Sequence, residues 1–351
     1  MVLFWFTLLA TSLLLYVLLD GFDLGVGMLS GLTRSEARRR TMLSAVAPVW
    51  DGNETWLVSG GVVLWGAFPL VYATLLSALY LPLLVMLAGL VLRGVAFEYR
   101  AKAQRMRWLW DAAFAGGSFA AAFIQGLMVG ALVEGLPLAD GRYTGGDFGW
   151  LSPFAVFSGI GLCLGYALLG AGWLVNKCDG DVRDAAYRQI PYLALGLLVV
   201  LIGVFAYALA DHLQVMDRWL ERPYLLIFPV IGVLAAIVLA ASVRSRRDHA
   251  PFPMVVLIFI AAFGTFAISF WPYMIPFSIT VDQAAAPHSS LAFMFWGAGV
   301  FVFPLMLVYT AINYQRQGRY DLAALLKGEP ACRSSMPSTR AAPSRRAKRA
   351  R

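Results

Sequence analysis

The sequence predicts an all-α, polytopic membrane protein with nine transmembrane helices. Nine apolar stretches recur along its 351 residues, 60% of all residues are hydrophobic, and the mean hydropathy is +0.70. Each stretch is long enough, or nearly so, to cross a hydrocarbon core of about 30 Å as a helix. Membrane strands are excluded because the apolar runs are continuous and do not alternate. The stretches cover residues 3–20, 56–72, 75–97, 112–133, 153–175, 190–211, 223–243, 254–271 and 291–314.

The basic residues support the number nine and orient the chain. The loops after stretches one, three, five and seven hold four, four, three and three Lys or Arg residues, and the segment after residue 314 holds ten. The loops on the other side hold only Arg142, Arg218 and Arg222. Because basic loops stay in the cytoplasm, the amino terminus is predicted to be periplasmic and the carboxyl terminus cytoplasmic. An even number of helices would break this alternation.

The first stretch ends in two carboxylates, Asp20 and Asp23, within the string Asp-Gly-Phe-Asp-Leu-Gly-Val-Gly over residues 20–27. Residues three apart share one helical face, and the glycines allow another backbone or an ion to approach closely. An ionised carboxylate in hydrocarbon is costly, so both side chains are expected to face protein or water. The alternative interpretation is a pair of loop residues at the membrane edge.

The second stretch is preceded by another carboxylate pair, Asp51 and Glu54, in Pro-Val-Trp-Asp-Gly-Asn-Glu-Thr-Trp over residues 48–56. These two again share a helical face, and the first turn of a helix favours negative charge. The alternative for Asp51 is a simple helix N-cap. Four carboxylates at two helix ends on the same side of the membrane favour proton uptake or cation binding over inert capping.

The third stretch contains Arg93, one to two turns from its inner end. An arginine at this depth is costly unless it is paired, and we assign it with Glu98 to structural ion pairing. Glu98 is five positions away and is a poor same-face partner for Arg93. Better partners are Asp20, Asp23 and Asp51, or a second subunit. The alternative is that Arg93 snorkels to the cytoplasmic surface.

The rest of the sequence offers few residues for catalysis or for binding a cofactor. Their tryptophans lie near the predicted interfaces, which is typical of an aromatic belt. His212, His249 and His288 lie in loops or at helix edges, so a haem held by two histidines within this chain is not expected. The three cysteines lack metal-site spacing, no metal site is predicted, and neither a phosphate-binding loop nor a nucleophile motif is present. The chain alone is expected to be catalytically poor.

Two regions are expected: a membrane domain over residues 1–320 and a disordered basic cytoplasmic tail over residues 321–351. The loops between stretches are short and hold no inserted soluble domain. The net charge of +8 follows from the topology, so no nucleic acid is expected as a partner. The amino terminus lacks the basic region and cleavage site of a signal peptide.

Three strings in this order resemble subunit II of cytochrome bd-type quinol oxidases. They are the two carboxylate strings at residues 20–27 and 48–56 and Arg-Gly-Val-Ala-Phe-Glu-Tyr-Arg at residues 93–100. Pro-Tyr-Met-Ile-Pro at residues 272–276 and Ala-Ala-Ala-Pro at residues 284–287 are similar to the cyanide-insensitive branch. The resemblance extends over about residues 1–320, and the first two strings together are highly specific.

The resemblance implies a subunit of a heterodimeric terminal oxidase that oxidises quinol and reduces oxygen to water in the bacterial cytoplasmic (inner) membrane. It implies two four-helix bundles plus one peripheral helix. The haems of the complex, b and d or b only, are expected in subunit I and not in this chain, in agreement with the scarcity of histidine. The expected partners are subunit I, quinol and membrane lipid. A small single-helix subunit and a structural quinone in this chain are left open.

The resemblance also assigns roles to the carboxylates. Asp51 matches the proton-pathway carboxylate of the family's subunit II, and Asp23 matches the second aspartate of the helix 1 motif on the same hydrophilic path. Position 54 is often glutamine in the family, so the resemblance does not give Glu54 a strict relay role. The clustering of charge keeps Asp20 and Glu54 among the candidates for the proton pathway or a cation site.

Two other functions compete with this interpretation. A stand-alone proton- or cation-coupled transporter would also contain embedded carboxylates and internal repeats, and residues 16–24 faintly resemble residues 166–174. Against a transporter, no stretch shows an unwound site at the membrane midplane, and the carboxylates lie at one end. The third interpretation is a structural scaffold in which the carboxylates are inert.

Overall fold

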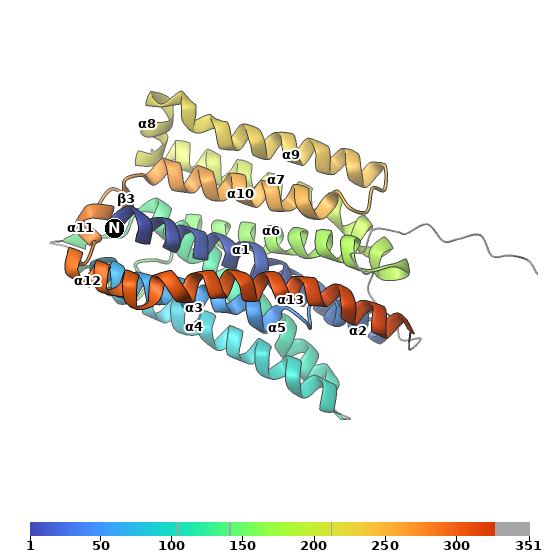
Figure 1. The fold of residues 1–351 in the computed structure, drawn as a ribbon. Helices are drawn as coiled ribbons and strands as arrows, with labels where there is room; N and C mark the ends of the chain where they lie inside the picture. Colours follow the sequence, from blue (N-terminus) through green and yellow to red (C-terminus); the bar gives the residue numbers. More distant parts are fainter. Residues whose placement is uncertain (104, 140–141, 212, 327–351) are drawn as a thin grey trace, which may run out of the picture.

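The computed structural model describes residues 1–103, 105–139, 142–211 and 213–326. Long helices running side by side make up nearly all of this part of the chain (Figure 1), so the predicted all-α class is confirmed. The long helices are α1 (Val2–Leu32), α3 (Trp50–Ala67), α4 (Pro69–Lys102), α5 (Arg107–Glu134), α6 (Pro153–Lys177), α7 (Gly180–Ala210), α9 (Ile227–Arg244), α10 (Pro251–Phe270) and α13 (Val300–Leu326).

Short elements connect the long helices. Two antiparallel hairpins, β1 with β2 and β3 with β4, follow α5 and α10 respectively. The π-helical turn η2 joins α12 to α13. The short elements are α2 (Glu36–Ser44), β1 (Leu138–Ala139), β2 (Arg142–Tyr143), α8 (Gln214–Glu221), η1 (Pro223–Leu226), β3 (Tyr273–Ile275), β4 (Ile279–Thr280), α11 (Val281–Ala284), α12 (His288–Met294) and η2 (Phe295–Gly299).

Eight helices in the described part of the chain are long and apolar enough to cross a membrane, which confirms a polytopic membrane protein. The second predicted span is not among them. It corresponds mainly to α3, whose 18 residues include the polar Asp51, Asn53 and Glu54. The number nine and the arrangement in two four-helix bundles therefore stay predictions. Most of the predicted tail, residues 327–351, lies outside the described part. The first residues of the predicted tail belong to α13, which continues to Leu326.

The end of the first helix differs from the sequence prediction. The apolar run stops at Asp20, but α1 continues without interruption to Leu32. The residues after Asp20 are buried almost without exception up to Ser30. Carboxylates that have partners are compatible with a buried helix, so the charge of Asp20 and Asp23 did not indicate where α1 ends. Asp20 and Asp23 consequently lie in the interior of α1.

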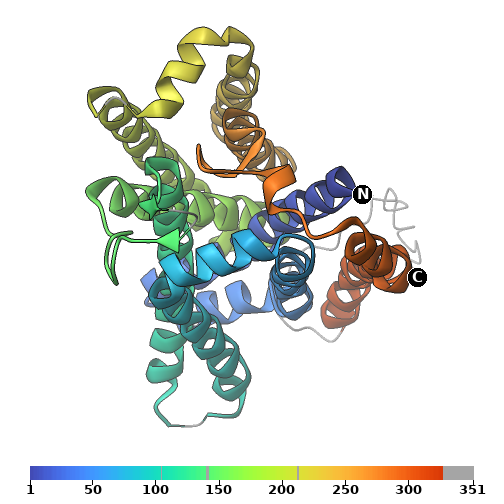
Figure 2. The same ribbon diagram turned by 90° about the vertical axis from the view of Figure 1, so that its left-hand side faces the viewer.

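Helices α1 and α6 form the centre of the protein. Seen end-on (Figure 2), α7, α9 and α10 lie on one side of them, α3, α4 and α5 on the other, and α13 at the margin. Close packing of α1 on α6 depends on glycine. A Cβ atom on Gly25 would lie 1.8 Å from the carbonyl oxygen of Tyr166, and one on Gly170 would lie 2.6 Å from the amide nitrogen of Val26. Small residues at such crossings let two backbones meet.

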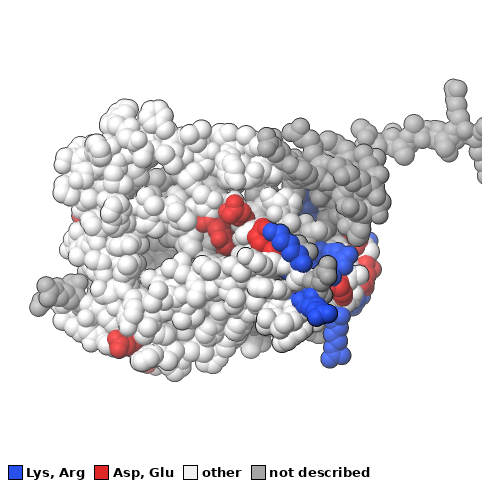
Figure 3. All heavy atoms as spheres, turned by 90° about the horizontal axis from the view of Figure 1, so that it is seen from below, with Lys and Arg blue, Asp and Glu red and all other residues white. Residues whose placement is uncertain are grey.

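One end of the protein, here called the basic end, holds α2 and the α4–α5, α6–α7 and α9–α10 connections. Figure 3 shows Lys and Arg side chains gathered toward one end of the face it presents. An ion-pair network ties α2 to the long helices. Arg100 of α4 contacts Glu36 at 2.9 Å and also Asp111 of α5, and Arg39 contacts Asp111 at 3.1 Å. Partial burial opposes ionisation of Glu36, but Arg100 and Arg39 hold the pKa of this carboxyl below its ordinary 4.5.

Candidate functional site

The candidate site is built around the two carboxylates of α1. The side chains of Asp20 and Asp23 are 0% and 1% exposed. This position, inside a continuous helix and surrounded by protein, excludes the alternative of two loop residues at the membrane edge. Buried carboxylates need charge partners or hydrogen-bond donors, and two further helices supply them.

Arg93 of α4 is the cation of the site. Its Nη2 atom lies 2.7 Å from Oδ1 of Asp20, and the same nitrogen contacts the Glu54 carboxylate of α3. The guanidinium side chain is 1% exposed, so it does not snorkel to the surface. The prediction that Asp20 is a better partner for Arg93 than Glu98 agrees with this geometry. Glu98 itself is exposed, it makes no ion pair within the described residues, and its structural role stays a prediction.

A second branch of the site connects α1, α3 and α13. The Asn53 side chain donates from Nδ2 to Oδ2 of Asp23 at 2.7 Å and to the carbonyl oxygen of Leu19 at 3.1 Å. The hydroxyl of Tyr314 donates to Oδ1 of Asn53 at 3.1 Å. Helix α13 therefore contributes Tyr314 to this branch, although Tyr314 is 261 positions from Asn53 in the sequence.

Access to the cluster follows the first turns of α3. Asp51 is exposed, and Glu54, one turn further, has a side chain that is 28% exposed. Asp51 is not a helix cap, since α3 begins at Trp50 and its N-cap residue is Val49. Asp51, Glu54 and Asp20 thus form a series of carboxylates of decreasing exposure. Of the four predicted carboxylates, the structure brings three into the buried cluster and leaves Asp51 at its exposed edge.

The charge balance of the cluster is uneven. Asp20, Asp23 and Glu54 face a single guanidinium, and Oδ2 of Asp20 and Oδ1 of Asp23 have no hydrogen-bond partner among the described residues. Nitrogen atoms Nε and Nη1 of Arg93 are also buried without a partner. A site with more carboxylates than cations can accept a further proton without gaining net positive charge. The described residues include no group of three or more His, Cys, Asp or Glu side chains placed to hold a metal ion.

Sequence reasoning missed several polar residues in this region. Tyr314 was not singled out, nor was the buried chain in which Tyr166 donates to Oε1 of Gln125 at 2.9 Å and Gln125 donates to the hydroxyl of Tyr16 at 2.7 Å. Each of these side chains interrupts or borders an apolar stretch, so a search for polar residues within the stretches could have found them. Their convergence required the fold.

The two described histidines lie far apart. His249 lies beside Asn176 at the end of α6, with 3.5 Å between Nδ1 and Oδ1. His288 begins α12, whose Leu291 carbonyl accepts a hydrogen bond from Trp5 near the start of α1. The two imidazoles are at opposite ends of the protein and cannot bind the same iron. His212 lies outside the described residues.

Comparison with known proteins places most of the chain in one family. The sequence model described as cytochrome bd terminal oxidase subunit II matches residues 1–316. A Haemophilus influenzae protein named probable cytochrome oxidase subunit 2 is 32% identical, over 90% of this chain and 94% of its own length. The Escherichia coli protein named cytochrome bd-I ubiquinol oxidase subunit 2 is 31% identical, over 88% of this chain and 92% of its own length.

A solved structure shares the fold. A chain in the structure of the bd oxidase from Geobacillus thermodenitrificans superimposes with a TM-score of 0.74. The match covers 93% of this chain and 98% of that chain at 16% sequence identity, so it is a likeness of fold. The family model reaches residue 316 of 351, and the fold match likewise covers most of the chain.

Proposed function

The chain belongs to the cytochrome bd terminal oxidase subunit II family, and we propose that it scaffolds the haem-bearing subunit and supplies that enzyme with a cytoplasmic proton pathway. It is a subunit of a quinol oxidase, a multi-pass protein of the inner membrane, and its haem-bearing complex includes a partner subunit I. The transporter alternative is not favoured by this membership. The position of the haems in subunit I rests on the poor fit of His249 and His288 to a haem.

The proton requirement follows from the reaction. Two quinols and one O₂ give two quinones and two waters, and the four protons that form water must reach a site buried in the membrane. Hydrocarbon does not conduct protons, so a polar, carboxylate-bearing path is needed. The observation that supports this path in the present chain is the buried contact of Arg93 with Asp20 and Glu54, next to the exposed Asp51.

In the proposed path, Asp51 collects a proton at the surface and passes it to Glu54, three residues later on the same face of α3. Glu54 and Asp20 share the guanidinium of Arg93, so a proton arriving on one carboxylate weakens its ion pair and strengthens the other. The branch through Asp23 and Asn53 keeps a second carboxylate within the same polar region. The path opens at the basic end, which the positive-inside rule assigns to the cytoplasm.

The experiment that tests this function uses the assembled oxidase. Asp51→Asn keeps the shape of the side chain but cannot carry a proton, and we expect normal assembly and haem content with quinol oxidase turnover lowered about tenfold. Asp51→Glu should retain more activity than Asp51→Asn. Glu98→Gln is the matched control, because Glu98 is also an exposed carboxylate at the basic end. Wild-type turnover in a fully assembled Asp51→Asn enzyme would assign the proton route to subunit I.

A further inference from the structure

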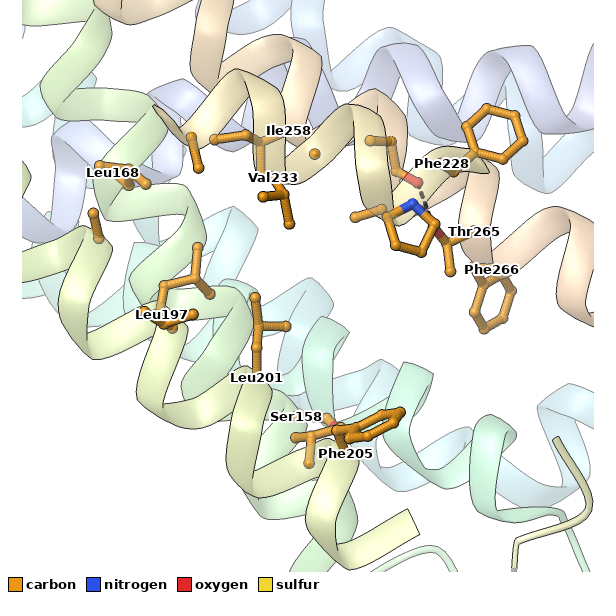
Figure 4. A pocket seen from close by; sticks show the side chains of 18 of the residues that line it. Ser158, Leu168, Leu197, Leu201, Phe205, Phe228, Val233, Ile258, Thr265 and Phe266 are labelled. Atoms are coloured by element: carbon orange, nitrogen blue, oxygen red, sulfur yellow. Dashed lines mark hydrogen bonds between the residues drawn. The ribbon is translucent and has the colours of Figure 1, made fainter. Parts of the chain in front are cut away.

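A large apolar groove lies on the opposite side of α6 from the carboxylate cluster. Helix α7 forms one wall, α9 and α10 form the other, and Figure 4 shows their side chains facing each other across an open space, with Leu201 and Phe205 on one side and Val233 and Ile258 on the other. The cavity volume is about 1090 Å³. Pockets for drug-sized ligands span roughly 300–1,000 Å³, so this groove lies at the upper end of that range.

The walls of the groove expose large apolar side chains that require contact with another apolar group. The lining side chains of Leu198, Phe205 and Val233 are 53%, 50% and 60% exposed. Along α9 the lining runs from Phe228 to Arg244, a distance of about 24 Å at 1.5 Å per residue. This length is most of a hydrocarbon core of about 30 Å. A chain-like hydrophobic molecule matches both the length and the chemistry of these walls.

The two ends of the groove differ. At the end remote from the basic end, α8 crosses the groove with Val215, Met216 and Trp219, and Nε1 of Trp219 donates to Oγ of Ser269 on α10 at 2.8 Å. At the basic end the lining includes the exposed Arg244. Arg244 makes no ion pair with the described residues, whereas Arg246 is paired with Asp184 at 2.8 Å.

Among the described residues that line the groove, the interior offers no free hydroxyl donor to a polar headgroup. The hydroxyl of Ser158 donates to the carbonyl oxygen of Phe154 at 2.9 Å, and that of Thr265 donates to its own helix at 2.7 Å. The Ser269 hydroxyl likewise donates to the Thr265 carbonyl oxygen at 2.7 Å. A headgroup that needs donors is therefore disfavoured inside the groove, and the cation at its mouth is the feature that recognises a charged group.

We propose that this groove binds one anionic phospholipid of the cytoplasmic leaflet. The acyl chains lie between α7 and α9, and the negatively charged headgroup lies against Arg244. The leaflet follows from the orientation proposed above, in which the basic end is cytoplasmic. A basic residue near the membrane surface attracts anionic lipid, and the acyl chains fill the open space between the lining side chains of α7 and α9.

The test is lipid retention by the purified oxidase complex in mild detergent, measured by native mass spectrometry and headgroup analysis. We expect one tightly bound anionic phospholipid per complex. Ala236→Trp and Ala240→Trp place a large ring in the groove and should lower retention at least fivefold. Ile237→Trp is the matched control on the same helix, since Ile237 is 60% exposed but does not line the groove. Its lipid content should equal that of wild type.

The role of the charge is tested separately. Arg244→Gln should lower the preference for anionic over zwitterionic lipid about fivefold, and Arg247→Gln, an exposed arginine outside the lining, should leave it unchanged. Equal retention in Ala236→Trp and wild type, or a quinone at one per complex in place of the phospholipid, would overturn the proposal. A reversed orientation of the chain would overturn the leaflet assignment. None of these measurements depends on turnover, so they are independent of the proton pathway.

Discussion

Removing the cation of the buried cluster is the perturbation with the largest expected effect on stability. Arg93→Gln leaves Asp20 and Glu54 facing each other without a positive charge, at a position where the arginine is 1% and Asp20 is 0% exposed. Breaking a buried ion pair from one side costs about 3–5 kcal/mol. We expect the thermal denaturation midpoint of the purified complex to fall by several degrees.

A triple variant separates the loss of ion pairing from a general packing defect. In Arg93→Gln combined with Asp20→Asn and Glu54→Gln, no charge of the ion pair remains, and replacing a whole buried ion pair is often nearly neutral. The triple variant should therefore be more stable than Arg93→Gln alone. Glu98→Gln, on the same helix as Arg93 but exposed, should change stability by less than about 0.5 kcal/mol. A triple variant that is less stable than the single one would refute the ion-pair account.

Three further outcomes are expected. Gly25→Ala should prevent α1 from packing on α6 and lower the yield of folded complex, because the new Cβ atom would overlap a backbone oxygen. Gly61→Ala is the control and should leave the yield unchanged, since no atom lies within 4 Å of its new Cβ atom. Glu36 has a lowered pKa, so its stabilising contribution is present above pH 4.5 and is lost as the pH falls through the lowered pKa. The melting temperatures of wild type and Glu36→Gln should therefore converge in acid. A difference that stays constant with pH would contradict this. A cysteine placed at 142–146 should react with an impermeant reagent added from the periplasmic side, and one placed at 245–249 should not; the reverse pattern refutes the proposed orientation.

The sequence predicted the class of fold because long apolar runs in a membrane have few alternatives to helix. It also identified Asp20, Asp23, Glu54 and Arg93, since charged residues within or beside such runs are rare and need partners. The end of α1 was missed because the apolar run stops at Asp20, whereas the helix is stabilised beyond that point by packing on its neighbours. Local hydropathy does not record that packing.

The contacts between helices were the least predictable part. Helix periodicity places Asp51 and Glu54 on one face, but it does not show that Glu54 reaches the arginine of α4 while Asp51 stays exposed. Tyr314 and Asn53 meet only because α13 returns to the start of α3. The apolar groove had no sequence signature, since its lining residues are ordinary members of membrane helices.

Proton uptake by the assembled oxidase during reaction with an oxygen pulse tests most directly whether protons enter through this chain. The rate would be followed with a pH-sensitive dye on the cytoplasmic side, for wild type, Asp51→Asn and the control Glu98→Gln, at equal haem content. If protons enter through this chain at Asp51, Asp51→Asn should slow uptake about tenfold and Glu98→Gln should not. Uptake at the wild-type rate in assembled Asp51→Asn would contradict the proposed pathway.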